Sequence, residues 1–311
     1  MRTPHFLTTV PLTATEIESL IDQASRFLTP TGLAAIPPST FTQASGNESR
    51  IVLAFYESST RTRLSFETAA HRIGARTVIF DPSTSSEGKG ETFLDTVQTI
   101  DAMGFDVLVL RHAQNGIGET ISASTSMSIV NAGDGTNCHP TQGMLDASAL
   151  RERLGTLGGQ KICIVGDVRH SRVARSQVDV LQKLGAEFAI CAPESLLPDD
   201  ERFASMPRFD SLDGACEWAT VISLLRIQRE RITADVVPSM DVYRARFAMT
   251  SDRLRKAPNV TIIHPGPVNY GVEIDEDVAA APQSLIRRQV THGVAMRMTI
   301  LNSILQQRNE L

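Results

Sequence analysis

Residues 51–71 read IVLAFYESSTRTRLSFETAAH. The first six residues are apolar or aromatic, as in a buried strand, and the last eight have the composition of a helix. Three hydroxyls and two guanidiniums separate these parts, on Ser59, Thr60, Arg61, Thr62 and Arg63. Backbone N–H groups are unpaired where a strand turns into a helix, and the helix dipole favours an anion there. Because an arginine can hold a phosphate through two parallel hydrogen bonds, the stretch predicts a phosphate site; the alternative is a helix cap with solvated arginines.

Strand-like and helix-like segments alternate on both sides of this stretch. In the first half, strands are predicted at 51–56, 77–80, 107–110 and 128–131, with helices near 13–28, 64–73 and 91–103. Strands are predicted again at 161–165, 187–191, 220–224 and 260–263, with a helix at 172–184. Short apolar strands that alternate with longer helices indicate right-handed crossovers and parallel sheets.

A predicted helix at 141–154 interrupts the alternation and indicates a border between two domains. The chain of 311 residues is long enough for two domains of ordinary size. A last helix, at 284–308, has apolar residues at helical spacing and can pack back on the first domain. We therefore predict an α/β fold with two doubly wound parallel-sheet domains joined by interdomain helices. The predicted domains are 1–140 together with 284–311, and 141–283.

The composition narrows the class of protein. Hydrophobic residues make up 41% and charged residues 21%, as in soluble globular proteins, and the net charge of −5 argues against a nucleic-acid surface. No apolar run approaches the ~18 residues of a membrane span, and no signal peptide is recognised. The four cysteines lack CxxC or zinc-finger spacing, so we expect no metal and a reducing cytoplasm. No glycine-rich turn follows a strand and no P-loop motif is present, so no nucleotide cofactor is expected.

Further polar residues stand after predicted strands of the first half. Arg111 directly follows the strand at 107–110, and the carboxyl ends of parallel strands share one edge of a sheet. His139 and Gln142 lie three residues apart at a helix start, so they project to the same side. The histidine can donate to a developing oxyanion, and the glutamine carbonyl can accept from an amide NH2. The alternatives are a solvated arginine and a structural histidine.

The second half and one loop supply the remaining candidates. Lys89 lies in a polar, glycine-containing loop that could carry it over an anion or simply be solvated. Arg172 and Arg226 follow the strands at 161–165 and 220–224 and suit a ligand with two carboxylates. Spacing alone does not choose between these two and their neighbours, any of which could be surface charges: Arg169, Arg175, Arg229 and Arg231. The turn His264-Pro265-Gly266-Pro267 can present carbonyl oxygens to a ligand NH2 group, or can be a rigid turn only.

Together these motifs resemble one protein family over nearly the whole chain. The match comprises residues 55–67, 89–92, 133–135, 139–142, 264–267, 289–290, 293–295 and 297–298. The chain resembles the aspartate/ornithine carbamoyltransferases, and most closely the catalytic chains of the aspartate-specific branch. Ser-Thr-Arg-Thr-Arg followed by His-Pro-Thr-Gln, in this order and separation, is highly specific for carbamoyl transfer.

The resemblance implies a role for each candidate residue. The ligands of carbamoyl phosphate would be Ser59, Thr60, Arg61, Thr62, Arg111, His139, Gln142, Pro265, Gly266 and Pro267. The catalytic group would comprise Arg61, Thr62, Arg111, His139 and Lys89. Aspartate would be bound by Lys89, Arg172, Arg226 and Gln228. The family forms homotrimers with shared sites, which implies that Ser85 and Lys89 come from a neighbouring subunit, with no metal or cofactor.

The same resemblance implies the reaction. The His264–Pro267 turn differs from the His-Cys-Leu-Pro turn of the ornithine enzymes, and their acidic and Ser-Met-Gly elements are not found. We therefore expect transfer of the carbamoyl group of carbamoyl phosphate to L-aspartate, giving N-carbamoyl-L-aspartate and phosphate in cytoplasmic pyrimidine biosynthesis. An ornithine-type or other carbamoyltransferase and a non-catalytic scaffold relative are the alternatives, and a regulatory chain or a dihydroorotase is a conceivable partner. Tyr270 stands where many relatives have arginine, which leaves any contact of that arginine in doubt.

Overall fold

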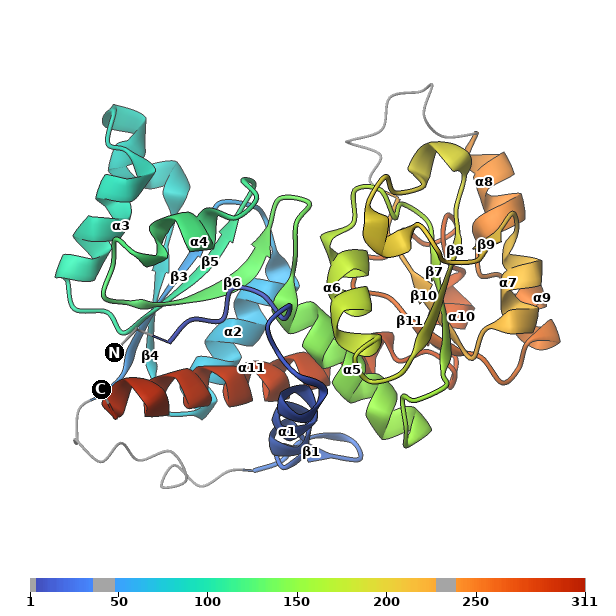
Figure 1. Cartoon of the computed structure of the whole chain (residues 1–311), viewed down its shortest axis with the longest axis horizontal. Helices are drawn as coiled ribbons and strands as arrows, with labels where there is room; N and C mark the ends of the chain where they lie inside the picture. Colours follow the sequence, from blue (N-terminus) through green and yellow to red (C-terminus); the bar gives the residue numbers. More distant parts are fainter. Residues whose placement is uncertain (1–3, 36–47, 228–238, 311) are drawn as a thin grey trace. The chain divides into compact units, whose positions relative to one another are not determined.

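The computed structural model describes residues 4–35, 48–227 and 239–310 (Figure 1). The chain divides into two compact units, one formed by Met1–Ser148 with Val290–Leu311 and the other by Ala149–Gln289. One border falls within helix α5 (Pro140–Leu154) and the other within helix α11 (Ile286–Asn309).

The first unit is built on a four-stranded parallel sheet in the order β4-β3-β5-β6. Its strands are β3 (Arg50–Phe55), β4 (Arg76–Phe80), β5 (Val107–His112) and β6 (Ser128–Asp134). The inner strands are apolar because both faces of the sheet are covered, and parallel sheets of this kind are buried on both sides. The order brings the carboxyl ends of β3, β5 and β6 next to one another, which places the residues after these strands on one edge.

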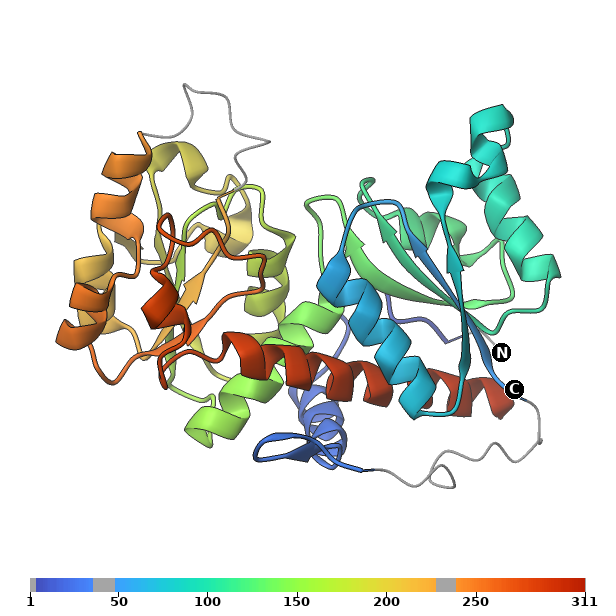
Figure 2. The ribbon, with the colours of Figure 1, turned by 180° about the vertical axis from the view of Figure 1, so that it is seen from behind.

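Helices cover the two faces of this sheet, as Figures 1 and 2 show from opposite sides. Alternate residues of β3 and β5, such as Val52 and Leu108, form one core with Val97 of α3 (Phe93–Ala102) and Ile121 of α4 (Ile117–Ser122). Helices α2 (Thr60–Arg72) and α11 lie side by side on the other face. The carboxyl-terminal part of α11 is therefore packed on the first unit, as predicted.

The second unit contains a five-stranded parallel sheet in the order β11-β10-β7-β8-β9. Its strands are β7 (Lys161–Val165), β8 (Glu187–Cys191), β9 (Arg208–Phe209), β10 (Val221–Leu224) and β11 (Thr261–Ile263). The accompanying helices are α6 (Arg172–Leu181), α7 (Leu212–Trp218), α8 (Met240–Phe247), α9 (Ser251–Lys256) and α10 (Glu276–Ala279). Tyr243 and Phe247 of α8 are fully shielded parts of its core.

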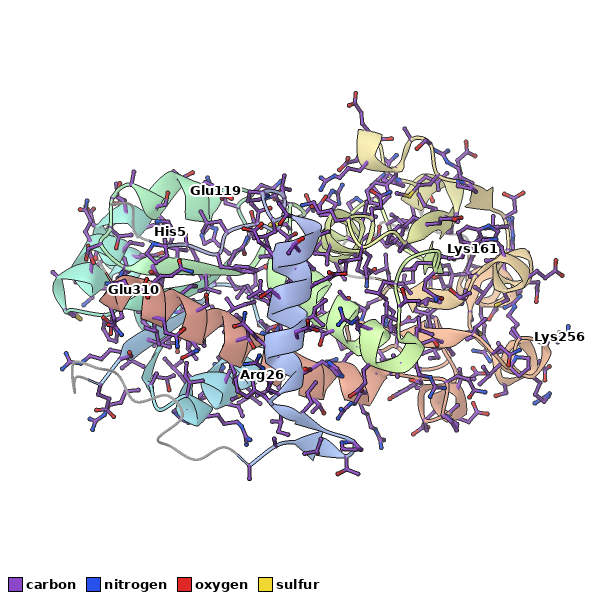
Figure 3. All side chains as sticks on the ribbon, turned by 60° about the horizontal axis from the view of Figure 1, so that its bottom comes forward. His5, Arg26, Glu119, Lys161, Lys256 and Glu310 are labelled. Carbon is purple, nitrogen blue, oxygen red and sulfur yellow. The ribbon has the colours of Figure 1, made fainter. Side chains whose placement is uncertain are left out.

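The amino-terminal region adds a small helix and hairpin. Helix α1 (Ala14–Ser25) begins with a capping box between Thr13 and Glu16, and the short strands β1 (Leu28–Thr29) and β2 (Gly32–Leu33) pair after it. Figure 3 labels Arg26 at the end of α1 and His5, whose ring accepts a hydrogen bond from the backbone N–H of Ile129 at 3.1 Å. Among the helices of the described residues, none has the length and apolarity needed to cross a bilayer.

The predicted α/β class with parallel sheets in two domains is confirmed, and each predicted strand is present within a few residues. Helix α2 begins at Thr60, earlier than the predicted residue 64, so the hydroxyl and arginine residues form its first turn. β9, α4 and helices α7 to α10 are not predicted from the sequence, because they are short and lack strong periodicity.

Candidate active site

The turn after β3 has the geometry of a helix start that is open to a ligand. Ser59 is the N-cap of α2, with an extended backbone (φ −158°, ψ 100°), and its side chain makes no capping hydrogen bond. Thr60 and Arg61 are exposed, whereas Thr62 is buried. The backbone N–H groups of a first helical turn have no partner within the helix, so the open cap leaves them to an anion.

Arg111 lies beside this turn because β5 pairs with both β3 and β6. Its backbone pairs with Phe55, and its carbonyl accepts a hydrogen bond from the Tyr56 N–H at 2.9 Å. The guanidinium Nη1 donates to the carbonyl of Ala132 in β6 at 3.4 Å, and Nε lies 3.6 Å from a carboxylate oxygen of Glu57. Arg111 is therefore held between the ends of the three strands, at the edge that carries the turn from β3 to α2.

A buried carboxylate shapes the turn that leads from β6 to His139. Asp134 accepts hydrogen bonds from the backbone N–H of Gly116 at 2.7 Å and of Cys138 at 3.2 Å, and from the Asn131 amide at 2.8 Å. This carboxylate fixes the start of α5, where His139 is only 4% exposed. Asp134 belongs to a family motif in the sequence, but its positioning role is visible only in the folded chain.

Gln142 is oriented by a second carboxylate. Its Nε2 donates to Oδ1 of Asp146 at 2.9 Å, one turn further along α5, and both side chains are buried. A carboxylate accepts hydrogen bonds only, so the amide nitrogen must face Asp146 and the carbonyl oxygen faces the other way. This orientation suits the predicted acceptance of a hydrogen bond from a substrate NH2 group.

The loop that contains Ser85 and Lys89 is folded and attached to the end of β3. It consists of two short 3-10 turns, Pro82–Thr84 and Ser86–Lys89, and Ser85 Oγ donates to the Pro82 carbonyl at 2.8 Å. The hydroxyl of Tyr56 donates to Glu87, and burial together with that carboxylate raises the pKa of Tyr56 well above its ordinary value. Lys89 itself is exposed.

The second unit places its candidates at the carboxyl edge of its own sheet. Arg172 is the first residue of α6, after β7, and Arg226 follows the adjacent strand β10; both side chains are partly exposed. The predicted ligand Gln228 lies outside the described residues. Pro265, Gly266 and Pro267 follow β11, the neighbour of β10.

Buried polar groups hold the turn after β11. His264 accepts a hydrogen bond from the Gly266 N–H on Nδ1 at 2.8 Å, and its Nε2 lies 3.3 Å from Oε1 of Glu273. The same Glu273 oxygen accepts from the Asn269 N–H at 2.6 Å. The turn is thus tied at three points. Glu273 is not predictable from the sequence, because no local pattern marks it.

Two family models cover this chain. Residues 4–152 match the carbamoyl-P binding domain of the aspartate/ornithine carbamoyltransferases, and residues 158–304 match their Asp/Orn binding domain. The chain belongs to the aspartate/ornithine carbamoyltransferase family. Among the described residues of this carbamoyltransferase, no group of His, Cys, Asp and Glu side chains is arranged to hold a metal ion.

Relatives of this carbamoyltransferase are found among named proteins and solved structures. The aspartate carbamoyltransferase catalytic subunit of Gemmatimonas aurantiaca is 47% identical over 292 residues, which cover 94% of this chain and 90% of the relative. That of Chlorobium luteolum is 47% identical over 263 residues, or 82% and 84% of the two chains. The catalytic subunit of M. jannaschii aspartate transcarbamoylase superposes with a TM-score of 0.84 at 28% identity, covering 97% and 98%. The Trypanosoma cruzi aspartate transcarbamoylase in complex with carbamoyl phosphate and aspartate superposes with a TM-score of 0.81 at 28% sequence identity, covering 97% of each chain.

Proposed function

We propose that this chain transfers the carbamoyl group of carbamoyl phosphate to the α-amine of L-aspartate, producing N-carbamoyl-L-aspartate and phosphate for pyrimidine biosynthesis. The observation that carries the proposal is the gathering of the open α2 turn, Arg111 and His139 at one edge of the first sheet. This combination provides an anion site next to groups that can polarise a carbonyl. The named relatives, which are aspartate carbamoyltransferase catalytic subunits, support the choice of substrates.

The first unit would bind carbamoyl phosphate. The phosphate would lie at the α2 turn on Ser59, Thr60, Arg61 and Thr62, with Arg111 at its side. Thr62, Arg111 and His139 would donate hydrogen bonds to the carbonyl oxygen. Gln142 would accept a hydrogen bond from the NH2 group with its side-chain oxygen, because its side-chain nitrogen is bonded to Asp146. The carbonyls of Pro265, Gly266 and Pro267 are proposed as further acceptors for that NH2 group.

The second unit would bind aspartate. Arg172 and Arg226 carry two positive charges at adjacent strand ends, which match a ligand with two carboxylates. Gln228, predicted as a third ligand, lies outside the described residues. The preference for aspartate over ornithine follows from these cationic side chains, because ornithine carries a positive charge of its own.

In the proposed reaction, the aspartate nitrogen attacks the carbamoyl carbon and forms a new C–N bond through a tetrahedral transition state. The bond between that carbon and the bridging phosphate oxygen breaks, its electron pair leaves with the phosphate, and the nitrogen passes a proton to the departing phosphate. Negative charge develops on the carbonyl oxygen and on the phosphate, where Arg61, Arg111 and His139 would stabilise it. One such preorganised donor typically contributes ~3 kcal/mol to the lowering of the barrier.

We further propose a homotrimer in the cytoplasm, with Ser85 and Lys89 completing the site of a neighbouring subunit. The edge strand β4 supports an assembly, because Val78 and Ile79 are 49% and 46% exposed on it. Exposed apolar residues on an edge strand favour association with another chain. The folded loop attached through Tyr56 and Glu87 would present Lys89 in one conformation.

A colorimetric assay for carbamoyl-aspartate tests the reaction, with aspartate, ornithine and related amines offered in parallel. We expect product with aspartate only. Product with ornithine, or no product with any of the amines, would overturn the assignment. A solution mass measurement tests the trimer independently. A monomeric mass would refute the proposal that neighbouring subunits share a site. The proposed ligands in the first unit would then still be tested by substitution.

A further inference from the structure

Helix α11 buries one arginine completely behind the candidate carbamoyl phosphate site. Arg297 is 3% exposed, and its guanidinium carbon lies 4.9 Å from the centre of the Phe66 ring. Burial lowers the pKa of Arg297 to about 9, and the charge of Arg111 acts in the same direction, whereas Asp146 opposes it. Removing a cation from water costs free energy unless hydrogen bonds and an opposite charge compensate. A buried arginine is therefore expected to have a specific structural role.

The first arm of the guanidinium reaches the phosphate turn. Nη1 of Arg297 donates to Oγ of Ser65 at 2.8 Å, and this hydroxyl in turn donates to the carbonyl of Thr62 at 3.0 Å. Thr62 and Ser65 are one helical turn apart on α2. The arginine is therefore two hydrogen bonds away from the backbone of a proposed phosphate ligand.

The second arm reaches the segment that carries His139 and Gln142. Nη2 of Arg297 donates to Oγ1 of Thr141 at 3.2 Å, and Thr141 lies between His139 and Gln142 at the start of α5. Asp146, the opposite charge near Arg297, accepts the hydrogen bond from the Gln142 amide. The same buried cation thus bears on the segment that carries His139 and Gln142, two of the residues proposed to contact the carbamoyl group.

The helix makes room for this side chain. Gly293 precedes Arg297 by one turn of α11, and a Cβ atom on it would lie 2.7 Å from Nη1 and 3.2 Å from Cδ2 of Leu145. Any side chain at this position would push the guanidinium away from its partners. The arginine is accordingly held in one place by packing as well as by hydrogen bonds.

We propose that Arg297 is a positioning residue of the carbamoyl phosphate site, which sets the α2 phosphate turn and the His139–Gln142 segment at a fixed separation. The inference rests on the proposed function and extends it to a residue that does not contact substrate. A planar guanidinium can donate to two helices at once in a fixed geometry, which a lysine ammonium on a flexible stem cannot do. A displacement of about 1 Å in such a site can cost about 100-fold in rate, so its spacing has to be held rigidly.

The test compares Arg297→Met, Arg297→Lys and Arg308→Gln in the full-length protein. Arg308 also lies on α11 and donates to the carbonyl of Ser126 at 2.7 Å, before β6 and away from its carboxyl end, so its variant is a matched control for loss of an arginine. We expect kcat/KM for carbamoyl phosphate to fall by about 100-fold in Arg297→Met and to be partly restored in Arg297→Lys. KM for aspartate should change little, and Arg308→Gln should retain normal kinetics.

The two arms are separated by Ser65→Ala and Thr141→Val. Loss of the first arm should weaken inhibition by inorganic phosphate, whereas loss of the second should lower kcat and leave phosphate inhibition unchanged. These variants also decide the question if Arg297→Met does not fold. Normal kinetics in folded Arg297→Met, or equal effects of Ser65→Ala and Thr141→Val on phosphate inhibition, would overturn the proposal.

Failure of the proposed reaction can be told apart from failure of this inference. If the wild-type protein forms no carbamoyl-aspartate, the reaction assignment is wrong. Calorimetric titration with inorganic phosphate still tests Arg297 in that case. Weaker phosphate binding by Arg297→Met than by Arg308→Gln would support the positioning role, and equal binding would refute it.

Discussion

His264 and Glu273 form a fully shielded pair in the second unit, with Nε2 of the histidine 3.3 Å from Oε1 of the glutamate. Because Nδ1 of His264 accepts the Gly266 N–H, the ring proton must be on Nε2, where it faces the carboxylate. The pair therefore fixes both the tautomer of the histidine and the path of the backbone through residues 265–267. The proposed NH2 acceptors lie on this piece of backbone.

Replacing the charged member of this pair should loosen the turn. In Glu273→Gln, the amide oxygen can still accept from His264 and from the Asn269 N–H, but an NH2 donor replaces the buried Oε2, which has no hydrogen-bond partner. We expect the free energy of unfolding to fall by about 1–3 kcal/mol, since a buried polar network is left incompletely satisfied. KM for carbamoyl phosphate should rise. Urea unfolding and steady-state kinetics measure the two effects, with the exposed Glu276→Gln as control; equal stability of both variants would contradict the role of the pair.

Arg61→Ala should abolish most turnover without affecting the fold. The side chain is exposed on the first turn of α2, so its removal opens no cavity. Loss of one donor to the developing charge is expected to lower kcat by about 100-fold or more. Arg63→Ala is the matched control, because Arg63 is exposed in the same turn and is not among the proposed phosphate ligands. Near-normal turnover of Arg61→Ala would refute the proposed phosphate ligand.

Tyr56→Phe tests the attachment of the loop that contains Ser85 and Lys89. The substitution keeps the ring, which packs edge-to-face on Phe93 with centroids 5.4 Å apart, and removes the hydroxyl that binds Glu87. The stability loss should be modest, about 1 kcal/mol, because one hydrogen bond is removed. The proposed role of Lys89 predicts lower kcat, and amide hydrogen exchange across 83–91 should become faster. Unchanged exchange in this loop would show that Tyr56 does not hold it.

Asp200 should contribute to stability in a pH-dependent way. Hydrogen bonds from Arg202 are the largest cause that holds the pKa of Asp200 below its ordinary value, and Arg175 adds to them. The contribution is complete above the unfolded-state pKa of about 3.9 and is lost as the pH falls through the lower folded-state pKa. Asp200→Asn should therefore lower the free energy of unfolding by about 0.5–1 kcal/mol near neutral pH, since water screens a partly exposed pair.

The difference between Asp200→Asn and wild type should shrink once the pH is below about 4. Urea unfolding at neutral and acidic pH measures it, and Asp199→Asn, which changes a more exposed carboxylate, is the control. A difference that stays constant with pH would mean that the ionised form of Asp200 is not what stabilises the fold.

Gly293→Ala should be destabilising although alanine is the better helix former. Propensity alone would favour alanine by about 1 kcal/mol in a helix interior. The new methyl group would approach Nη1 of Arg297 at 2.7 Å, and overpacking of a filled core typically costs about 1–3 kcal/mol, so the net effect should be a loss. Gly214→Ala in α7 is the control, because its Cβ would meet Phe209 at an ordinary 3.6 Å. Thermal unfolding that ranks both variants above wild type would contradict the tight packing around Arg297.

Much of this protein could be predicted from local patterns. Strands such as β5 and β7 are short apolar runs because their sheets are covered on both faces. The turn after β3 is recognisable in the sequence from its consecutive hydroxyl and guanidinium groups. The start of α2 was placed too late because serine, threonine and arginine are ambiguous at a helix end. The ligand assignments and domain roles inferred from family resemblance stay predictions.

What local patterns could not predict is which residues stand behind the site. Arg297 and Ser65 are separated by 232 positions in the chain, and their hydrogen bond exists only because α11 returns to lie beside α2. The hydrogen bond between Tyr56 and Glu87, which are 31 positions apart, likewise depends on how a loop packs, whereas Gln142 and Asp146 meet through the spacing of one helical turn. Periodicity and turn chemistry act between neighbours in the chain and therefore specify strands, helices and the proposed anion-binding turn. Partners of buried charges are chosen by the order of strands and the packing of helices, so only the folded chain shows them.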